Sequence, residues 1–485
     1  MAKLCVVRCD GVLADANFRV QGLSRGVAGS DGSDWVASFV RALCRGLDDS
    51  GLRWMVLRNH EDLPDKVGHD VDILVHPKDE PRIDGLVREV VHRRGLFLVQ
   101  AHRGANLHTF FDVAAADLHG RFLLHVDVQT AARHRGRLLI DADDLLAHRY
   151  RVRDLWVPMP GIEAYALLLH AALHKAELKD RYAERLVALD QAEPGGSLRI
   201  ATERLGSELA RRVTSVRTES QLLALRRDLG RAIDRRYPGN VARRLLFNFR
   251  SGSATIKALV RPRGVFVAFL GPDGAGKSST TDLLTTMLRA PSDVLGVHRV
   301  YLGSGTPLLP TRRLMQALHA RTGRVDKKQR VRDVAPRRLR GALHVMADEI
   351  LRYWVHVRPR LAPSGIVLAD RYAYDIFRVN NQMVSRLWFR RLVTAIIPEP
   401  NITFFLDGDP AMIVARKGEL TLSETVRQHD AYRALADFVP GFRRIDLTVR
   451  DDRALRGVAL VILDAFAARN GGLARSAGGS PAAAS

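Results

Sequence analysis

The sequence predicts a multidomain α/β protein, with a parallel sheet flanked by helices on both faces in its C-terminal half and a smaller α+β domain with a helical segment in its N-terminal half. Three observations predict this class. The chain has 485 residues, which exceeds the size of a single hydrophobic core and indicates two or three domains. From Val265 to about Asn470, short apolar strands alternate with helical patterns, as a parallel sheet with crossover helices requires. Between Gly161 and Phe249, apolar residues recur at helical spacing instead.

The N-terminal half starts with a Gly-rich, weakly patterned segment over 1–30 and continues with a domain expected over 31–155. The elements predicted there are, in chain order, the capped helix SDWVASFVRALCRGLDDSGL, the strands RWMVLRN and VDILV, the helix IDGLVREVVHRRG, and the strand pair HTFFDVA and RFLLHVDVQT. A helical segment is expected over 156–255. The stretch RSGSATIKALVRPRG then predicts a break in the chain's regular structure.

The C-terminal domain is expected over 262–470. Three apolar runs there have the length and composition of fully buried strands, namely VFVAFL, GIVLAD and ITFFLD. The tail over 471–485, GGLARSAGGSPAAAS, has too few large apolar residues to bury a core, so we expect it to be disordered.

One stretch, FLGPDGAGKSST, follows the first of these strands and has the spacing of a phosphate-binding loop. Glycines at 271, 274 and 276 allow a sharp turn from strand to helix, so that backbone N–H groups converge on an anion. A lysine there reaches the β- and γ-phosphates, and the serine hydroxyl after it ligates Mg²⁺. We therefore expect ATP and Mg²⁺ to be held by Gly271, Pro272, Asp273, Gly274, Ala275, Gly276, Lys277, Ser278 and Ser279. A structural Gly-rich turn is the alternative interpretation.

Charged residues after the next two strands are candidates for the chemistry. Asp370 ends the strand GIVLAD, where a carboxylate beside the loop would hold the metal ion together with Ser278. Arg371 follows it and offers a bidentate contact to a phosphate. Arg416, on the helix after ITFFLD, is a candidate lid residue that brings positive charge to the transferred group. A strand-end cap and a solvated helix face are the alternatives for these positions.

These motifs together resemble the thymidylate kinase family of nucleoside-monophosphate kinases over roughly 265–470. The residues that carry the resemblance are FLGPDGAGKSST, Asp370-Arg371-Tyr372, NITFFLDGDPAMIVARKGE and RQHDAYRALA. The resemblance implies transfer of the γ-phosphoryl group of ATP to a small phosphorylated acceptor, with Lys277 on the donor, Asp273 on the acceptor's sugar and Arg371 on its phosphate. The run after Arg371, Tyr372-Ala-Tyr-Asp-Ile, lacks the serine and the Ala-Tyr-Gln run of that family.

The N-terminal half carries a second carboxylate pattern. Asp70 and Asp72 lie on one face of a predicted strand, because side chains alternate with period two, and Asp127 comes from a second strand. Three such carboxylates can hold two Mg²⁺ ions, and the pattern resembles the nucleotidyltransferase superfamily over 34–153. Leu57-Arg58-Asn59 stands where that family has a Gly-Ser or Gly-Gly turn. A degenerate domain, or carboxylates paired with arginines, is the alternative, and a bifunctional kinase and nucleotidyltransferase is the alternative function.

The net charge of +22 is the extreme feature of the composition and favours polyanionic partners. It is densest over 312–340, where we weigh a solvated insertion against a polyanion-binding surface, and a nucleotide-sensing, polyanion-binding regulator is a further alternative function. The three cysteines cannot form a complete disulfide set, and no apolar run has the length of a membrane span or a secretory signal, so we expect a cytoplasmic protein. A homodimer is left open. His170 and His174, one helical turn apart, are expected to pack or to form a basic face rather than to bind zinc.

Overall fold

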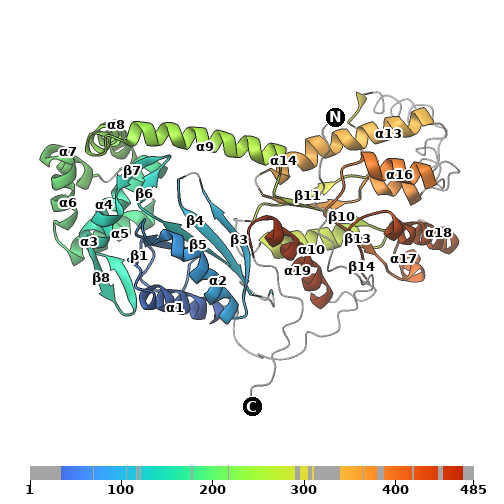
Figure 1. Cartoon of the computed structure of the whole chain (residues 1–485), viewed down its shortest axis with the longest axis horizontal. Coiled ribbons are helices and arrows are strands. Elements are labelled where there is room, and N and C mark those ends of the chain that lie inside the picture. The colour runs from blue at the N-terminus through green and yellow to red at the C-terminus, as the bar shows by residue number, and fades with distance from the viewer. Residues whose placement is uncertain are drawn as a thin grey trace, which may run out of the picture.

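The computed structural model describes residues 34–68, 70–104, 106–115, 118, 122–175, 179–216, 218–289, 295–303, 308–310, 339–362, 364–378, 387–417, 420–445 and 452–472. The predicted segment 1–30, almost all of the basic stretch 312–340 and the tail after 472 lie outside the described residues. The described residues form a mixed α/β protein with one five-stranded sheet in each half (Figure 1). The predicted fold class is confirmed.

The N-terminal sheet has five strands in the order β1-β2-β5-β4-β3. Only β2 and β5 pair in parallel, so the sheet is mixed. Its strands are β1 (Trp54–Val56), β2 (Asp70–Val75), β3 (Phe97–Arg103), β4 (Thr109–Ala114) and β5 (Leu123–Gln129). The apolar residues of α1 (Asp34–Asp49) and α2 (Ile83–Arg93) pack on one face. Strand β3, which the sequence analysis did not predict, completes this sheet.

Two hairpins and a helical segment follow the sheet. The hairpins are β6 (Ala132–His134) with β7 (Arg137–Ile140), and β8 (Arg149–Val152) with β9 (Leu155–Pro158). The helical elements are α3 (Ala142–Ala147), α4 (Pro160–Leu169), the π-helix η2 (His170–Lys175), α5 (Asp180–Ala192), α6 (Gly196–Leu205), α7 (Ser207–Thr214) and α8 (Glu219–Arg236). Their apolar faces form one core with Met55 and Leu74 of the sheet. The helical segment is therefore packed on the sheet face that α1 and α2 leave open.

A long helix, α9 (Asn240–Val260), then leads into the C-terminal half. The predicted break at residues 250–264 is wrong for most of its length, because the helix runs on to Val260 and the chain is irregular only before Val265. Both ends of α9 are tied to the body of the protein. Asn240 bonds the backbone of Leu138 at one end, and Arg358 donates to the carbonyls of Leu259 and Val260 at the other.

The C-terminal sheet is parallel throughout, with strand order β11-β12-β10-β13-β14. Its strands are β10 (Val265–Leu270), β11 (Val297–Tyr301), β12 (Ile366–Asp370), β13 (Ile402–Leu406) and β14 (Phe442–Ile445). The helical elements around it are α10 (Lys277–Arg289), α13 (Leu339–Arg352), η3 (Tyr353–Val357), α14 (Arg358–Leu361), η4 (Ala373–Arg378), α16 (Leu387–Ile396), α17 (Pro410–Lys417), α18 (Leu422–Arg433), η5 (Ala434–Asp437) and α19 (Asp452–Arg469).

Every residue of β10 is buried, because the strand alternates between two cores. Val265, Val267 and Phe269 face a core with α10 and α19. Phe266 and Leu270 face a second core that includes residues of α13, η3, α16 and α18. The prediction of a parallel sheet buried on both faces is thus confirmed in its central strand.

The two halves share a core. Phe97, Val99 and Phe122 of the N-terminal sheet region belong to the same cluster of buried residues as α19 and β10. The backbone N–H of Ala101 in β3 also donates to the carbonyl of Asn470, 3.1 Å away, just after α19. The last helix therefore packs between the C-terminal sheet and the outer strand of the N-terminal sheet.

Candidate active site

The predicted phosphate-binding loop joins the buried end of β10 to the start of α10. Gly271, Gly274 and Gly276 have φ values of 151°, 97° and 93°, a region that L side chains rarely adopt. A Cβ atom at Gly271 would also lie 3.3 Å from the Cβ of Ala275. The sequence places glycine where the turn requires it, and the turn directs the N-terminus of a 13-residue helix toward the carboxyl edge of the sheet.

Lys277 is buried at the first position of α10. Its ammonium donates to the carbonyls of Gly271 and Pro272, at 2.9 and 2.8 Å, and lies 3.9 Å from Asp273. The positive charge is therefore held over the loop itself, close to where backbone N–H groups would meet an anion.

Ser278 and Asp370 meet across two neighbouring strands. Phe269 of β10 and Asp370 of β12 are paired in register, which brings the end of β12 beside the loop. The hydroxyl of Ser278 donates to Oδ2 of Asp370 at 2.5 Å. The side chain of Asp370 is buried, and its Oδ1 has no hydrogen-bond partner among the described residues. An unsatisfied buried carboxylate oxygen next to a serine hydroxyl is an arrangement that suits a hard divalent cation.

Arg371 points back at the loop. Its backbone is strained, with φ at 73°, and its N–H donates to the carbonyl of Phe269 at 3.1 Å. The guanidinium contacts Asp273 through Nη2 and Asp375 through Nη1, the latter at 2.7 Å. The hydroxyl of Tyr432, on α18, donates to the other oxygen of Asp375 at 2.8 Å. A buried tyrosine and a buried aspartate thus fix the orientation of Arg371.

Asp375, Tyr432 and Arg299 are the residues of this region that sequence reasoning missed. Arg299, on β11, lies 2.6 Å from Asp282 and 3.7 Å from Asp370. Tyr432 stands in the stretch RQHDAYRALA and Asp375 in the run Tyr372-Ala-Tyr-Asp-Ile, but neither was assigned a role, and Arg299 stands in no motif. Arg416 is exposed on α17, which packs against α18, and its role as a lid residue stays a prediction.

The N-terminal carboxylates are arranged differently. Asp72 and Asp127 are paired in register on the parallel strands β2 and β5, as predicted. Arg58, however, takes both oxygens of the buried Asp72, at 2.6 and 2.9 Å. Gln129 donates to Asp127 at 3.1 Å. Oδ1 of Asp127 is buried without a hydrogen-bond partner among the described residues, and Nδ1 of His108 lies 3.4 Å from it. Arg58 thus occupies Asp72 alone, and the metal-binding role of Asp70, Asp72 and Asp127 stays a prediction.

The pKa shifts of Asp72 and Arg58 reflect both their burial and their ion pair. Burial raises the pKa of Asp72, while the hydrogen bond and charge of Arg58 work to lower it. Burial works to lower the pKa of Arg58, but the hydrogen bond to Asp72 and the charges of Asp72 and Asp70 together raise it by more, so that the net shift is upward. Arg58 thus provides the positive charge that compensates the buried carboxylate of Asp72.

Other clusters lie away from both carboxylate sites. His60, Glu61 and Glu163 bring possible metal-ligand atoms within 4.8 Å of one another, but Arg185 bonds both glutamates at 2.7 and 2.8 Å, which gives the cluster its own cation. The rings of His170 and His174 on η2 have centroids 4.6 Å apart, and the ring of His134 lies tilted against that of His174 with the centroids 4.8 Å apart.

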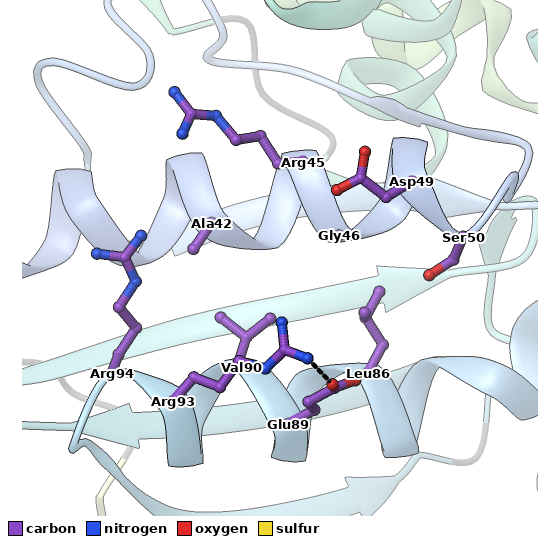
Figure 2. A pocket seen from close by; sticks show the side chains of 10 residues that line it. All are labelled: Ala42, Arg45, Gly46, Asp49, Ser50, Leu86, Glu89, Val90, Arg93 and Arg94. Carbon is purple, nitrogen blue, oxygen red and sulfur yellow. Dashed lines mark hydrogen bonds and ion pairs between the residues drawn. The ribbon is translucent and has the colours of Figure 1, made fainter.

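A surface hollow of about 380 Å³ lies between α1 and α2, away from the phosphate-binding loop (Figure 2). Arg45, Arg93 and Arg94 line it together with the acidic Asp49 and Glu89, and Arg93 pairs with Glu89 (Figure 2). Because these charges are mixed and exposed to solvent, the hollow shows no preference for one kind of ligand. Within the described ranges, no helix is long and apolar enough to cross a membrane.

A parallel five-stranded sheet, a glycine-rich loop before a helix and a carboxylate on the adjacent strand end define a P-loop nucleotide-kinase-like region. Two curated proteins, each described as a probable thymidylate kinase, are distantly similar to part of the chain. The one from Pyrobaculum aerophilum is 28% identical over 151 residues, covering 31% of this chain and 68% of the relative. The one from Pyrobaculum calidifontis is 26% identical over 152 residues, with the same two coverages of 31% and 68%. No family model matches the chain.

Proposed function

We propose that the protein is an ATP-dependent phosphotransferase of the nucleoside-monophosphate kinase type, which moves the γ-phosphoryl group to a small phosphorylated acceptor with Mg²⁺. The observation that carries the proposal is the hydrogen bond of Ser278 to the buried Asp370, whose Oδ1 has no hydrogen-bond partner in the described part of the chain, beside the glycine-rich loop. The partial similarity to probable thymidylate kinases supports the same class of reaction. We assign the activity to a domain over 262–470, joined to domains over 31–155 and 156–255.

The proposed roles follow from position and charge. Bound ATP with Mg²⁺ supplies the phosphoryl group and neutralises its developing charge. Ser278 and Asp370 would hold the ion, while Lys277 and the loop N–H groups from Gly271 to Ser279 bind the phosphates of the nucleotide. Arg371 would bind the acceptor's phosphate, exchanging its contact with Asp273 for a bidentate one.

The experiment is acceptor-dependent ADP formation. The full chain is mixed with ATP, Mg²⁺ and a panel of nucleoside monophosphates, and ADP release is followed with and without each acceptor. Replacing Lys277 by alanine is expected to lower kcat/KM by about a hundredfold or more, the size of effect seen when one donor to the developing charge is removed. Lys66→Ala, at an exposed lysine in the N-terminal half, is the matched control and should behave as wild type.

The result that would overturn the proposal is ATP binding without acceptor-dependent turnover for any member of the panel. Equal turnover by wild type and Lys277→Ala would also reject the loop as the donor site. Nucleotide binding, measured separately with a fluorescent ATP analogue, distinguishes a variant that has lost the loop's conformation from one that has lost only chemistry.

A further inference from the structure

The helix α9 presents an apolar stripe to solvent. Figure 1 shows it running along one edge of the molecule from the N-terminal half to the C-terminal half. Of its 21 residues only Asn240, at its start, is buried. Phe249 is 74% exposed and Leu245 is 65% exposed. The large apolar side chains exposed on this helix are Val241, Leu245, Leu246, Phe249, Ile256, Leu259 and Val260. We call this set the α9 stripe.

The α9 stripe faces away from the rest of the protein. Successive residues of a helix are turned by about 100°, which places the whole stripe in one sector roughly 140° wide. Of the half-buried residues of α9, Phe247, Ser251 and Ala258 lie on the opposite side of the helix, and only Ser253 lies within the sector of the stripe. On that side the helix backbone passes close to Gly136, where an added Cβ would lie 2.6 Å from the carbonyl of Arg243. The stripe is therefore not the packing face of the helix, and a helix that exposes such a face normally covers it with a partner.

The charges of α9 select the kind of partner. The helix carries Arg243, Arg244, Arg250 and Lys257 and has no acidic residue. At helical spacing Arg243, Arg250 and Lys257 follow one edge of the α9 stripe, and Arg244, which lies 4.0 Å from Asp234, stands beyond the other edge. Long basic side chains at such positions can reach past an apolar surface to anionic groups. A second copy of α9 packed against the first would bring like charges together without a compensating carboxylate. An anionic surface complements them.

A tryptophan extends the apolar surface at the end of the helix. Trp354 of η3 is 53% exposed, and the guanidinium of Arg358 stacks on its ring at 5.2 Å. The same guanidinium donates to the carbonyl of Val260, the last residue of α9, at 2.6 Å. An amphipathic tryptophan beside a basic amphipathic helix is a composition typical of proteins that lie in the interface of a bilayer.

We propose that the α9 stripe docks on an anionic lipid membrane surface, with the helix in the plane of the interface and its cations on the lipid headgroups. The bilayer would cover the apolar side chains, and the ends of α9 would remain tied to both halves of the protein by Asn240 and Arg358. The proposal does not depend on the phosphotransferase activity.

The test is flotation of the purified full chain with phosphatidylcholine vesicles that contain or lack phosphatidylserine. Wild type is expected to bind the anionic vesicles and not the neutral ones. The double variant Leu245→Ser, Phe249→Ser should bind at least about tenfold more weakly, because each substitution removes apolar area that the bilayer buries. A matched control, Val187→Ser with Leu223→Ser, changes two exposed apolar residues outside α9 and should bind like wild type.

Both positions in α9 are exposed, so the double variant should keep the melting temperature of wild type, and this is checked first by circular dichroism. Three results would overturn the proposal. The first is that wild type does not float with anionic vesicles. The second is that the α9 variant floats as well as wild type, which would mean that charged residues elsewhere in the protein bind the lipid. The third is a wild-type dimer in light scattering that the α9 substitutions dissociate, which would identify a second copy of the chain as the occupant.

Discussion

Replacing Arg58 by methionine removes the guanidinium from Asp72 and keeps a side chain of similar length. The side chain of Asp72 is 1% exposed and that of Arg58 is 39% exposed, so the substitution leaves a buried carboxylate without its cation. Breaking a buried ion pair from one side costs about 3–5 kcal/mol. Because Arg58 is partly open to solvent, we expect a smaller loss, about 2–3 kcal/mol in the free energy of unfolding of the N-terminal half at neutral pH.

The pH dependence of this loss follows from the pKa of Asp72. Burial already raises that pKa in the folded protein, and without Arg58 it rises further. A carboxyl group whose folded pKa is raised costs stability above that pKa, and the cost disappears as the pH falls toward the unfolded value. The deficit of Arg58→Met should therefore shrink at acid pH. Adding Asp72→Asn to the variant should recover part of it at neutral pH, since the amide carries no charge.

The assay is urea unfolding followed by tryptophan fluorescence, with amide hydrogen exchange on β2 and β5 to localise the change. Trp54, buried in β1 next to β2, reports on this sheet. Arg41→Met is the matched control, because Arg41 and Asp65 form an ion pair in which both side chains are exposed, and such pairs contribute about 0–1 kcal/mol. A loss no larger for Arg58→Met than for the control would refute the buried-pair reasoning. Stabilisation of wild type by Mn²⁺ that Asp72→Asn abolishes would show that a metal ion displaces Arg58.

Two further predictions concern single side chains. Tyr432→Phe removes a hydrogen bond to the buried Asp375, worth about 1–3 kcal/mol. Because Asp375 orients Arg371, the substitution should raise the KM for a phosphorylated acceptor several-fold while the KM for ATP stays unchanged. An equal rise in both KM values would contradict a positioning role. Burial, with His174 and neighbouring arginines, lowers the pKa of His134 to about 4, so its NMR titration should be flat from pH 7 to 5.5 and start only below. Since the unfolded chain binds this proton near its ordinary pKa of 6.5, His134 contributes stability above that value that is lost as the pH falls toward 4, and a midpoint near 6.5 in the folded protein would contradict the shift.

The sequence predicted the C-terminal sheet well because its information is local. Each of the three core strands is an apolar run that is buried on both faces, and the glycine-rich loop is a contiguous motif with unusual backbone requirements. Asp370 was found because it ends one of these strands, and neighbouring parallel strands end at the same edge. Strands β11 and β14 escaped prediction, since each is only partly buried and carries charged residues among its apolar ones.

The helix α9 shows where local information fails. Arg250-Ser-Gly-Ser looks like a linker, because serine and glycine favour turns over helices. The structure keeps the helix intact through this run and holds its ends by contacts to Leu138 and Arg358, which are distant in sequence. Tertiary anchoring thus overrides a weak propensity, and an apolar stripe that would have been divided between two elements becomes continuous.

The two halves of the protein also differ in the partners of the buried carboxylates on their sheets, Asp72 on β2 and Asp370 at the end of β12. In the N-terminal half, both oxygens of Asp72 are bound by one guanidinium, so its charge is already neutralised. In the C-terminal half, Asp370 has a serine hydroxyl on one oxygen, a guanidinium no closer than 3.7 Å, and no hydrogen bond on the other oxygen among the described residues. A buried, ionised carboxylate with one oxygen lacking a hydrogen bond destabilises the folded state unless a cation binds to it. Ser278 belongs to the glycine-rich motif and was expected beside Asp370, whereas Arg58 stands in no such motif and its contact with Asp72 is seen only in the folded protein. Asp370 is therefore the first place to look for metal-dependent chemistry, and Asp127 is the second, because its Oδ1 is also buried without a hydrogen-bond partner among the described residues.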